Sequence, residues 1–96
     1  MINDYAAEIG RGECTLIDVR EANEFAAGHL PGAINMPLSE LSADSLKLAE
    51  VKAPLYLYCK SGARSAAAER IFYQAGFTEA QNIGGILDWT GEITLS

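Results

Sequence analysis

The sequence is poor in the residues that hold metals and disulfides. Its 96 residues include two cysteines, Cys14 and Cys59, and one histidine, His29. Two cysteines are too few for a disulfide-rich scaffold, and with one histidine they do not complete the four-ligand set of a structural zinc site. We therefore expect no metal and no organic cofactor. We also expect a cytoplasmic protein, because thiols stay reduced in the cytosol.

Basic residues are scarce as well. The chain has 7 Lys and Arg against 13 Asp and Glu, which gives a net charge of −6. Such a chain is a poor match to nucleic acid or to an anionic membrane. No apolar run is long enough to span a bilayer, and residues 1–5 do not start a signal peptide. We expect a monomer that binds neither nucleic acid nor membrane.

Apolar residues are plentiful, at 49% of the chain, which is enough for one packed core. No repeat or linker interrupts the sequence, so we expect a single domain over residues 1–96. Short apolar runs predict strands at 16–19, 33–36, 55–58 and 80–83, the last of them ended by Gly84 and Gly85. Helical patterns cover 3–9, 20–27, 39–41, 44–49, 66–75 and 86–89, with Asn3 or Asp4 capping the first. This alternation predicts a parallel sheet with helices on both faces.

The most informative stretch is the loop at residues 59–65, which joins an apolar strand to the clearest helix. A cysteine at a helix N-terminus has a lowered pKa, and the unpaired N–H groups there favour negative charge. Small, flexible loop residues let the N–H groups converge on one point. Cys59 is therefore the expected nucleophile. The expected substrate-binding residues are Lys60, Ser61, Gly62, Ala63, Arg64 and Ser65.

A second strand end is a candidate for the same site. Ligands of such sheets bind beyond the C-terminal ends of the strands, and Arg20 follows one of these ends. If the strands predicted at 16–19 and 55–58 are neighbours, Arg20 lies at the same site as Cys59 and binds substrate. The alternative is an ion pair between Arg20 and Glu24, four residues later on a helix. We expect His29, in a Gly-His-Leu-Pro-Gly turn, to be structural.

Several motifs, taken together, resemble those of the rhodanese family. Residues 16–20, 24–25 and 28–33 are similar to its first signature, residues 58–65 to its active-site loop, and Gly76-Phe77 and Gly84-Gly85-Ile86 with Trp89 to its closing motifs. The resemblance implies an α/β, three-layer fold with a mostly parallel central sheet of four to five strands and helices on both faces. Family members begin with a short strand, which is absent here or reduced to Met1-Ile2.

The same resemblance implies a thiosulfate sulfurtransferase. Cys59 would take a sulfane sulfur from thiosulfate or another small anionic persulfide donor and pass it to cyanide or a thiol acceptor. One alternative is a sulfur carrier or docking module for a partner protein. Another is a small cysteine-dependent phosphatase. Phosphatases of related fold place five residues between cysteine and arginine, whereas four separate Cys59 from Arg64, a tighter loop that favours sulfur over phosphate.

Overall fold

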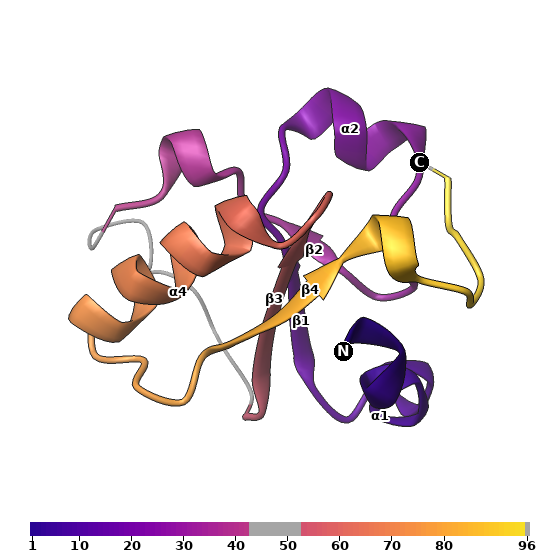
Figure 1. Ribbon diagram of the computed structural model, residues 1–96, viewed down its shortest axis with the longest axis horizontal. Helices are drawn as coiled ribbons and strands as arrows, with labels where there is room; N and C mark the ends of the chain where they lie inside the picture. The colour runs from indigo at the N-terminus through magenta and orange to yellow at the C-terminus, as the bar shows by residue number, and fades with distance from the viewer. Residues whose placement is uncertain (43–52, 96) are drawn as a thin grey trace.

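A four-stranded parallel sheet forms the centre of the molecule (Figure 1). The computed structural model describes residues 1–42 and 53–95. The strands are β1 (Thr15–Asp18), β2 (Ile34–Asn35), β3 (Leu55–Cys59) and β4 (Gln81–Gly85), in the order β2-β1-β3-β4. Every neighbouring pair is parallel, which confirms the predicted α/β architecture.

Helices cover both faces of this sheet. They are η1 (Ile2–Tyr5), α1 (Ala6–Arg11), α2 (Ala22–Ala27), η2 (Leu38–Glu40), α4 (Ala63–Gln74) and η3 (Ile86–Asp88), where η marks a 3-10 helix. In Figure 1, α4 lies on one side of the sheet, α1 lies on the other, and α2 lies beyond the strand ends. Within the described ranges, no helix is long and apolar enough to cross a membrane.

Alternation along β3 divides the core into two clusters. Leu55, Leu57 and Cys59 pack with Ala68 and Phe72 of α4. The tyrosines between them face the other way, into a cluster with Ile2, Ile9, Leu16, Leu30 and Ile83. Because successive strand side chains point to opposite faces, one apolar run serves both cores and both faces need a helical cover. The result is the expected three-layer fold.

The helix after the loop has its apolar face where the sequence predicts it. Ala68 and Phe72 are fully buried, and Ile71 and Ala75 pack against the same cluster. The helix begins at Ala63 rather than at 66, because the first turn is formed by the loop residues themselves. Phe77 folds back as expected, and its ring centroid lies 5.7 Å from that of Phe72.

Three other boundary predictions need correction or qualification. Gly84 and Gly85 do not end the fourth strand but lie within it, where they pair with Tyr58 and Cys59 after a register shift in β3. The first helix begins at Ile2, so neither Asn3 nor Asp4 caps it; the Asn3 side chain instead donates to the Asp88 carbonyl oxygen at 2.8 Å. Ahead of β1 the described chain has no strand, as expected, and residues 2–11 are helical. The helix predicted at 44–49 lies outside the described residues.

Candidate active site

The loop after β3 curls around the Cys59 sulfur. β3 ends at Cys59 and α4 begins at Ala63, with Gly62 as its N-cap at a φ of 106°. This left-handed conformation is readily adopted by glycine and strains other residues. It turns the Gly62 N–H back toward the strand, so that this N–H donates to the sulfur at 3.0 Å. The loop therefore presents its backbone to Cys59, as the sequence predicts.

Ser65 adds a side-chain hydroxyl to the groups that surround the Cys59 sulfur. It lies in the first turn of α4, is fully buried, and has its Oγ 3.4 Å from the Cys59 sulfur. Burial by itself raises the pKa of the Cys59 thiol, but hydrogen bonds from the Ser65 hydroxyl and from the backbone N–H groups of Ser65, Gly62 and Ser61 outweigh it and lower the pKa. A lower pKa means more thiolate, the nucleophilic form, at neutral pH.

Strand β4 packs directly against the loop at residues 59–65. A Cβ atom on Gly85 would overlap the Lys60 carbonyl oxygen and lie 2.6 Å from the Cα of Ser61. The loop therefore rests directly on the glycine backbone. On the outer side, the Leu87 N–H donates to the same Lys60 carbonyl at 3.2 Å. The sequence marked Gly85 as part of a closing motif, but gave no sign that its missing side chain makes room for the cysteine loop.

Asn82 is a second supporting residue of β4 that the sequence did not indicate. Its Nδ2 donates to the Gly62 carbonyl at 3.1 Å, and its Oδ1 accepts from the Gly84 N–H at 3.0 Å. Its Oδ1 also lies 2.7 Å from the Ser65 Oγ. One amide side chain thus joins the N-cap of α4, the hydroxyl beside the sulfur and the strand below them. No local pattern marks an asparagine for such a role.

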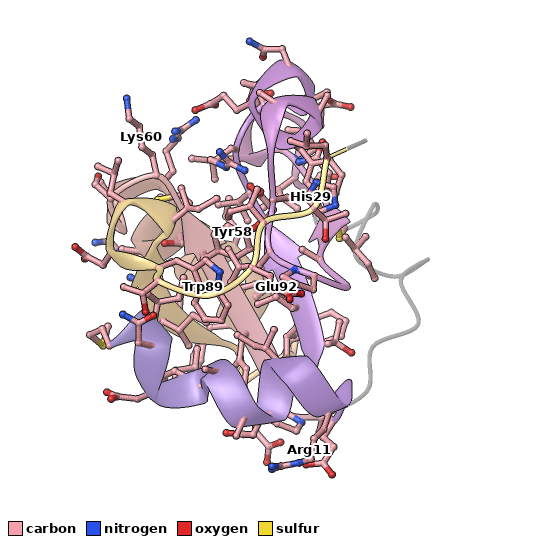
Figure 2. The ribbon with its side chains drawn as sticks, turned by 90° about the vertical axis from the view of Figure 1, so that its right-hand side faces the viewer. Arg11, His29, Tyr58, Lys60, Trp89 and Glu92 are labelled. Carbon is pink, nitrogen blue, oxygen red and sulfur yellow. The ribbon has the colours of Figure 1, made fainter. Side chains whose placement is uncertain are left out.

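The two basic residues of the loop lie in different surroundings. Arg64 forms a bidentate ion pair with Glu24 of α2, at 2.6 and 3.0 Å. The hydrogen bonds from Arg64 lower the pKa of Glu24 to about 2, and the same pair raises the pKa of Arg64. Lys60 is exposed and makes no ion pair within the described part of the chain. Figure 2 shows its side chain at the rim of the molecule, far from Arg11 at the opposite end.

Arg20 lies on the neighbouring strand end, since β1 and β3 are adjacent. Its Nη2 donates to an oxygen of the fully buried Asp18 at 2.7 Å and to the Gly28 carbonyl at 2.7 Å. Its guanidinium carbon is 5.9 Å from the centre of the Tyr58 ring. The alternative partner, Glu24, is taken by Arg64. Arg20 therefore joins the end of β1, through Asp18, to the C-cap of α2, through Gly28.

His29 and the two β3 tyrosines lie in packed positions. His29 is 6% exposed, stacks on Phe25 with ring centroids 3.7 Å apart, and has its Nδ1 2.9 Å from the Phe25 carbonyl oxygen. Its backbone pairs with Thr94. Tyr58 is fully buried and its hydroxyl accepts a hydrogen bond from the Leu30 N–H at 3.1 Å. These contacts give His29 and Tyr58 structural roles (Figure 2).

Comparison with solved structures supports the same architecture. A rhodanese-related protein from Thermoplasma volcanium superposes with a TM-score of 0.83 at 32% identity, over 99% of this chain and 95% of that one. The match therefore covers nearly the whole of both chains.

Sequence comparison gives three informative relatives. YqhL of Bacillus subtilis is 44% identical over 85 residues, which are 88% of this chain and 67% of that protein. The thiosulfate sulfurtransferase PspE of Escherichia coli is 33% identical, over 75% of this chain and 70% of PspE. YrkF of Bacillus subtilis, whose name gives it a proposed role as a sulfur carrier, is 37% identical over 80% of this chain, which spans only 42% of YrkF. The sequence profile of the rhodanese-like domain matches residues 1–92, and the chain therefore belongs to the rhodanese-like domain family.

Proposed function

We propose that this domain is a sulfurtransferase in which Cys59 carries sulfur as a persulfide, with thiosulfate as a donor and cyanide or a thiol as acceptor. One observation carries the proposal: the Cys59 sulfur accepts a hydrogen bond from the Gly62 N–H at 3.0 Å with the Ser65 hydroxyl at 3.4 Å. A buried sulfur with such donors is stabilised as a thiolate. The sulfurtransferase name of the relative PspE is consistent with this role.

The chemistry is a pair of nucleophilic displacements at sulfur. The Cys59 thiolate attacks the outer sulfur of thiosulfate, a new S–S bond forms, and the S–S bond of thiosulfate breaks as sulfite leaves with the electron pair. Cyanide or an acceptor thiolate then attacks the outer sulfur of the persulfide, and Cys59 leaves as a thiolate. No net oxidation takes place, and no proton is needed when cyanide is the acceptor.

The loop supports both steps. We expect its backbone N–H groups to stabilise the negative charge of the thiolate and of the persulfide, as the donors of an oxyanion hole do. We propose that Lys60, Ser61, Gly62, Ala63, Arg64 and Ser65 bind the donor, with Lys60 supplying a cation that no described ion pair occupies. We assign Arg20 a supporting part, because Asp18 and Gly28 already engage its guanidinium. A reducing compartment such as the cytosol would keep Cys59 available.

Intact mass measurement tests the proposal directly. The protein is incubated with thiosulfate, its mass is recorded, cyanide is added, and the mass is recorded again. We expect a gain of one sulfur that cyanide removes, with thiocyanate formed in equal amount. The gain is expected to persist in Cys14→Ser, the matched control that keeps the active-site thiol, and to vanish in Cys59→Ser. A sulfur gain that survives in Cys59→Ser, or none in the unaltered chain, contradicts the proposal.

A role as a sulfur carrier for a partner protein is the second candidate, and the similarity to YrkF favours it. It keeps the persulfide and changes the acceptor. In the same experiment a carrier loads with sulfur yet turns over thiosulfate and cyanide slowly. The phosphatase alternative has less support, because the loop keeps four residues between Cys59 and Arg64 and Arg64 is paired with Glu24. Hydrolysis of an aryl phosphate at a rate above that of sulfur transfer would favour it.

A further inference from the structure

The Ser65 hydroxyl has one hydrogen and several acceptors around it. Its Oγ lies 2.7 Å from Asn82 Oδ1, 3.1 Å from the Gly62 carbonyl oxygen, 3.4 Å from the Cys59 sulfur and 3.5 Å from the Gly84 carbonyl oxygen. A hydroxyl donates only once, so these acceptors compete. The Gly84 distance is at the limit for a hydrogen bond. Three acceptors therefore compete for this hydrogen: Asn82 Oδ1, the Gly62 carbonyl oxygen and the Cys59 sulfur.

The Gly62 carbonyl already has its donors. The Ala66 N–H donates to it at 3.0 Å and the Asn82 Nδ2 donates to it at 3.1 Å. A carbonyl oxygen has two lone pairs, and both are used. The hydroxyl hydrogen of Ser65 is thus shared between Asn82 Oδ1 and the Cys59 sulfur.

The orientation of the Asn82 amide is fixed by its other partners. The Gly84 N–H needs an acceptor, which places Oδ1 there and leaves Nδ2 facing the Gly62 carbonyl oxygen. Oδ1 is therefore the atom that faces Ser65 at 2.7 Å. When the hydroxyl hydrogen turns away, Oδ1 keeps the Gly84 N–H as a partner, so turning leaves no buried group unsatisfied.

We propose that Asn82 is a positioning residue that competes with the Cys59 sulfur for the hydroxyl hydrogen of Ser65. In the thiol form, Ser65 donates to Asn82 and accepts from the S–H group. In the thiolate form, the hydroxyl turns and donates to the sulfur. Asn82 therefore favours the thiol over the thiolate. It also favours the loaded state, because an attached sulfur carries the charge one atom outward and lets Ser65 return to Asn82. This second point rests on the proposed function.

The charged surroundings of the sulfur are the same in the alanine variants below. Among the described residues they comprise Lys60 and Arg64 of the loop and α4, Glu69 of α4, Glu24 of α2, and Asp18 and Arg20 at the end of β1. Replacing Asn82 by alanine changes no charge. A change in the titration of Cys59 between these variants therefore reports the hydrogen bonds.

The test is the pH dependence of Cys59 alkylation by iodoacetamide, measured in a Cys14→Ser background with Asn82→Ala, Ser65→Ala and the double variant. This titration needs no sulfur transfer, so its outcome is independent of the proposed function. Below the midpoint of the unaltered site, we expect Asn82→Ala to speed alkylation about twofold to threefold, because the Ser65 hydrogen loses its nearest acceptor and is then shared between the sulfur and the Gly62 carbonyl, which no longer accepts from Asn82. Ser65→Ala is expected to slow alkylation by a similar factor. In the Ser65→Ala background, Asn82→Ala is expected to have little effect.

Should the alanine variant fold poorly, Asn82→Asp provides a second comparison with and without Ser65. It keeps an oxygen that accepts from the Ser65 hydroxyl and from the Gly84 N–H. A carboxylate holds the Ser65 hydrogen more strongly than an amide does. We expect Asn82→Asp to slow alkylation more when Ser65 is present than when it is alanine. If either substitution at Asn82 shifts the pH midpoint equally with and without Ser65, Asn82 acts only by supporting the loop or by its charge, and the inference is overturned.

Discussion

Two neighbouring strands of this sheet end at the same edge, and each ends in a group that can be an anion. Strand β1 ends at Asp18 and β3 at Cys59. Asp18 is held by the side chain of Arg20 at 2.7 to 3.0 Å. Cys59 is held by a backbone N–H at 3.0 Å and a hydroxyl at 3.4 Å. The positive charge of Arg20 thus stabilises the Asp18 carboxylate, whereas the dipoles of an N–H and a hydroxyl stabilise a Cys59 thiolate.

The difference gives a physical reason for Asp18 to be structural and for Cys59 to be the proposed nucleophile. A buried carboxylate bound by a guanidinium is neutralised by fixed partners, which also fill its acceptor positions. The cysteine has two cations nearby in sequence, yet the structure shows Arg64 bound to Glu24 and Lys60 exposed. Its sulfur is stabilised without being capped by a cation. A sulfur held in this way remains able to react, which is what the proposed function requires of Cys59.

The largest expected effect is on stability, at the end of β1. Asp18→Ala leaves the Arg20 guanidinium buried without its carboxylate, which costs about 3–5 kcal/mol in the free energy of unfolding. Urea unfolding measures this loss. The matched control is Asp4→Ala, since Asp4 also has an ion pair, 3.1 Å from the N-terminal amine, but its side chain is 80% exposed. The control should lose less than about 1 kcal/mol. Equal losses in the two variants would show that burial does not separate them.

The next effect is on activity, at the end of β3. Gly85→Ala places a methyl group against the Lys60 carbonyl, so the loop must move and its N–H groups no longer point at the Cys59 sulfur. We expect sulfur transfer to fall about 100-fold, the usual cost of losing a donor of this kind. Cyanide-dependent thiocyanate formation measures the rate. Gly10→Ala is the control: no atom lies within 4 Å of the added methyl, and alanine in a helix adds about 0.5–1 kcal/mol of stability. A Gly85→Ala variant as active as Gly10→Ala would mean that loop geometry does not limit the reaction.

Much of the fold follows from local patterns in the sequence. The buried strands and the apolar face of α4 repeat at regular spacings, and such periodicity is a property of neighbouring residues. Cys59 could be proposed as the nucleophile for the same reason, because strand, loop and helix are consecutive. The error at Gly84 and Gly85 came from a local rule, because glycines usually end a strand. The reason for Gly85 is a tertiary contact: the cysteine loop packs so closely on β4 that only glycine leaves room for it there.

The supporting residues could not be predicted, because their partners are distant in sequence. Asn82 and Ser65 are 17 positions apart, and Glu24 and Arg64 are 40 positions apart. A pattern of neighbours identifies Glu24 as a partner for Arg20 on the next helical turn. The tertiary structure offers Glu24 a different cation and gives Arg20 a different carboxylate. Which pair forms depends on how α2 lies against the start of α4, and no single sequence motif contains that information.

The smallest effect concerns the ion pair that holds the loop helix to α2. Arg64 lowers the pKa of Glu24 from 4.5 to about 2, so the pair stabilises the fold above pH 4.5 and this contribution disappears as the pH falls toward 2. The Glu24 side chain is 28% exposed, and we expect Glu24→Gln to cost only about 1 kcal/mol at pH 7. The variant keeps an oxygen that can accept from the Glu21 N–H, so α2 retains its cap.

Urea unfolding at pH 7, 4 and 2.5 measures how this difference changes with pH. The gap between the unaltered chain and Glu24→Gln should narrow steadily over this series, because below pH 4.5 the Glu24 carboxyl group of the unfolded chain is protonated and folding must remove that proton. Arg64→Gln breaks the same pair from the other side and should show the same narrowing, and adding Glu24→Gln to it should cost little more. A gap that keeps its pH 7 size at pH 2.5 would mean that Glu24 acts by packing. The partly buried Glu24–Arg64 pair would then differ from the fully buried Asp18–Arg20 pair in kind as well as in size.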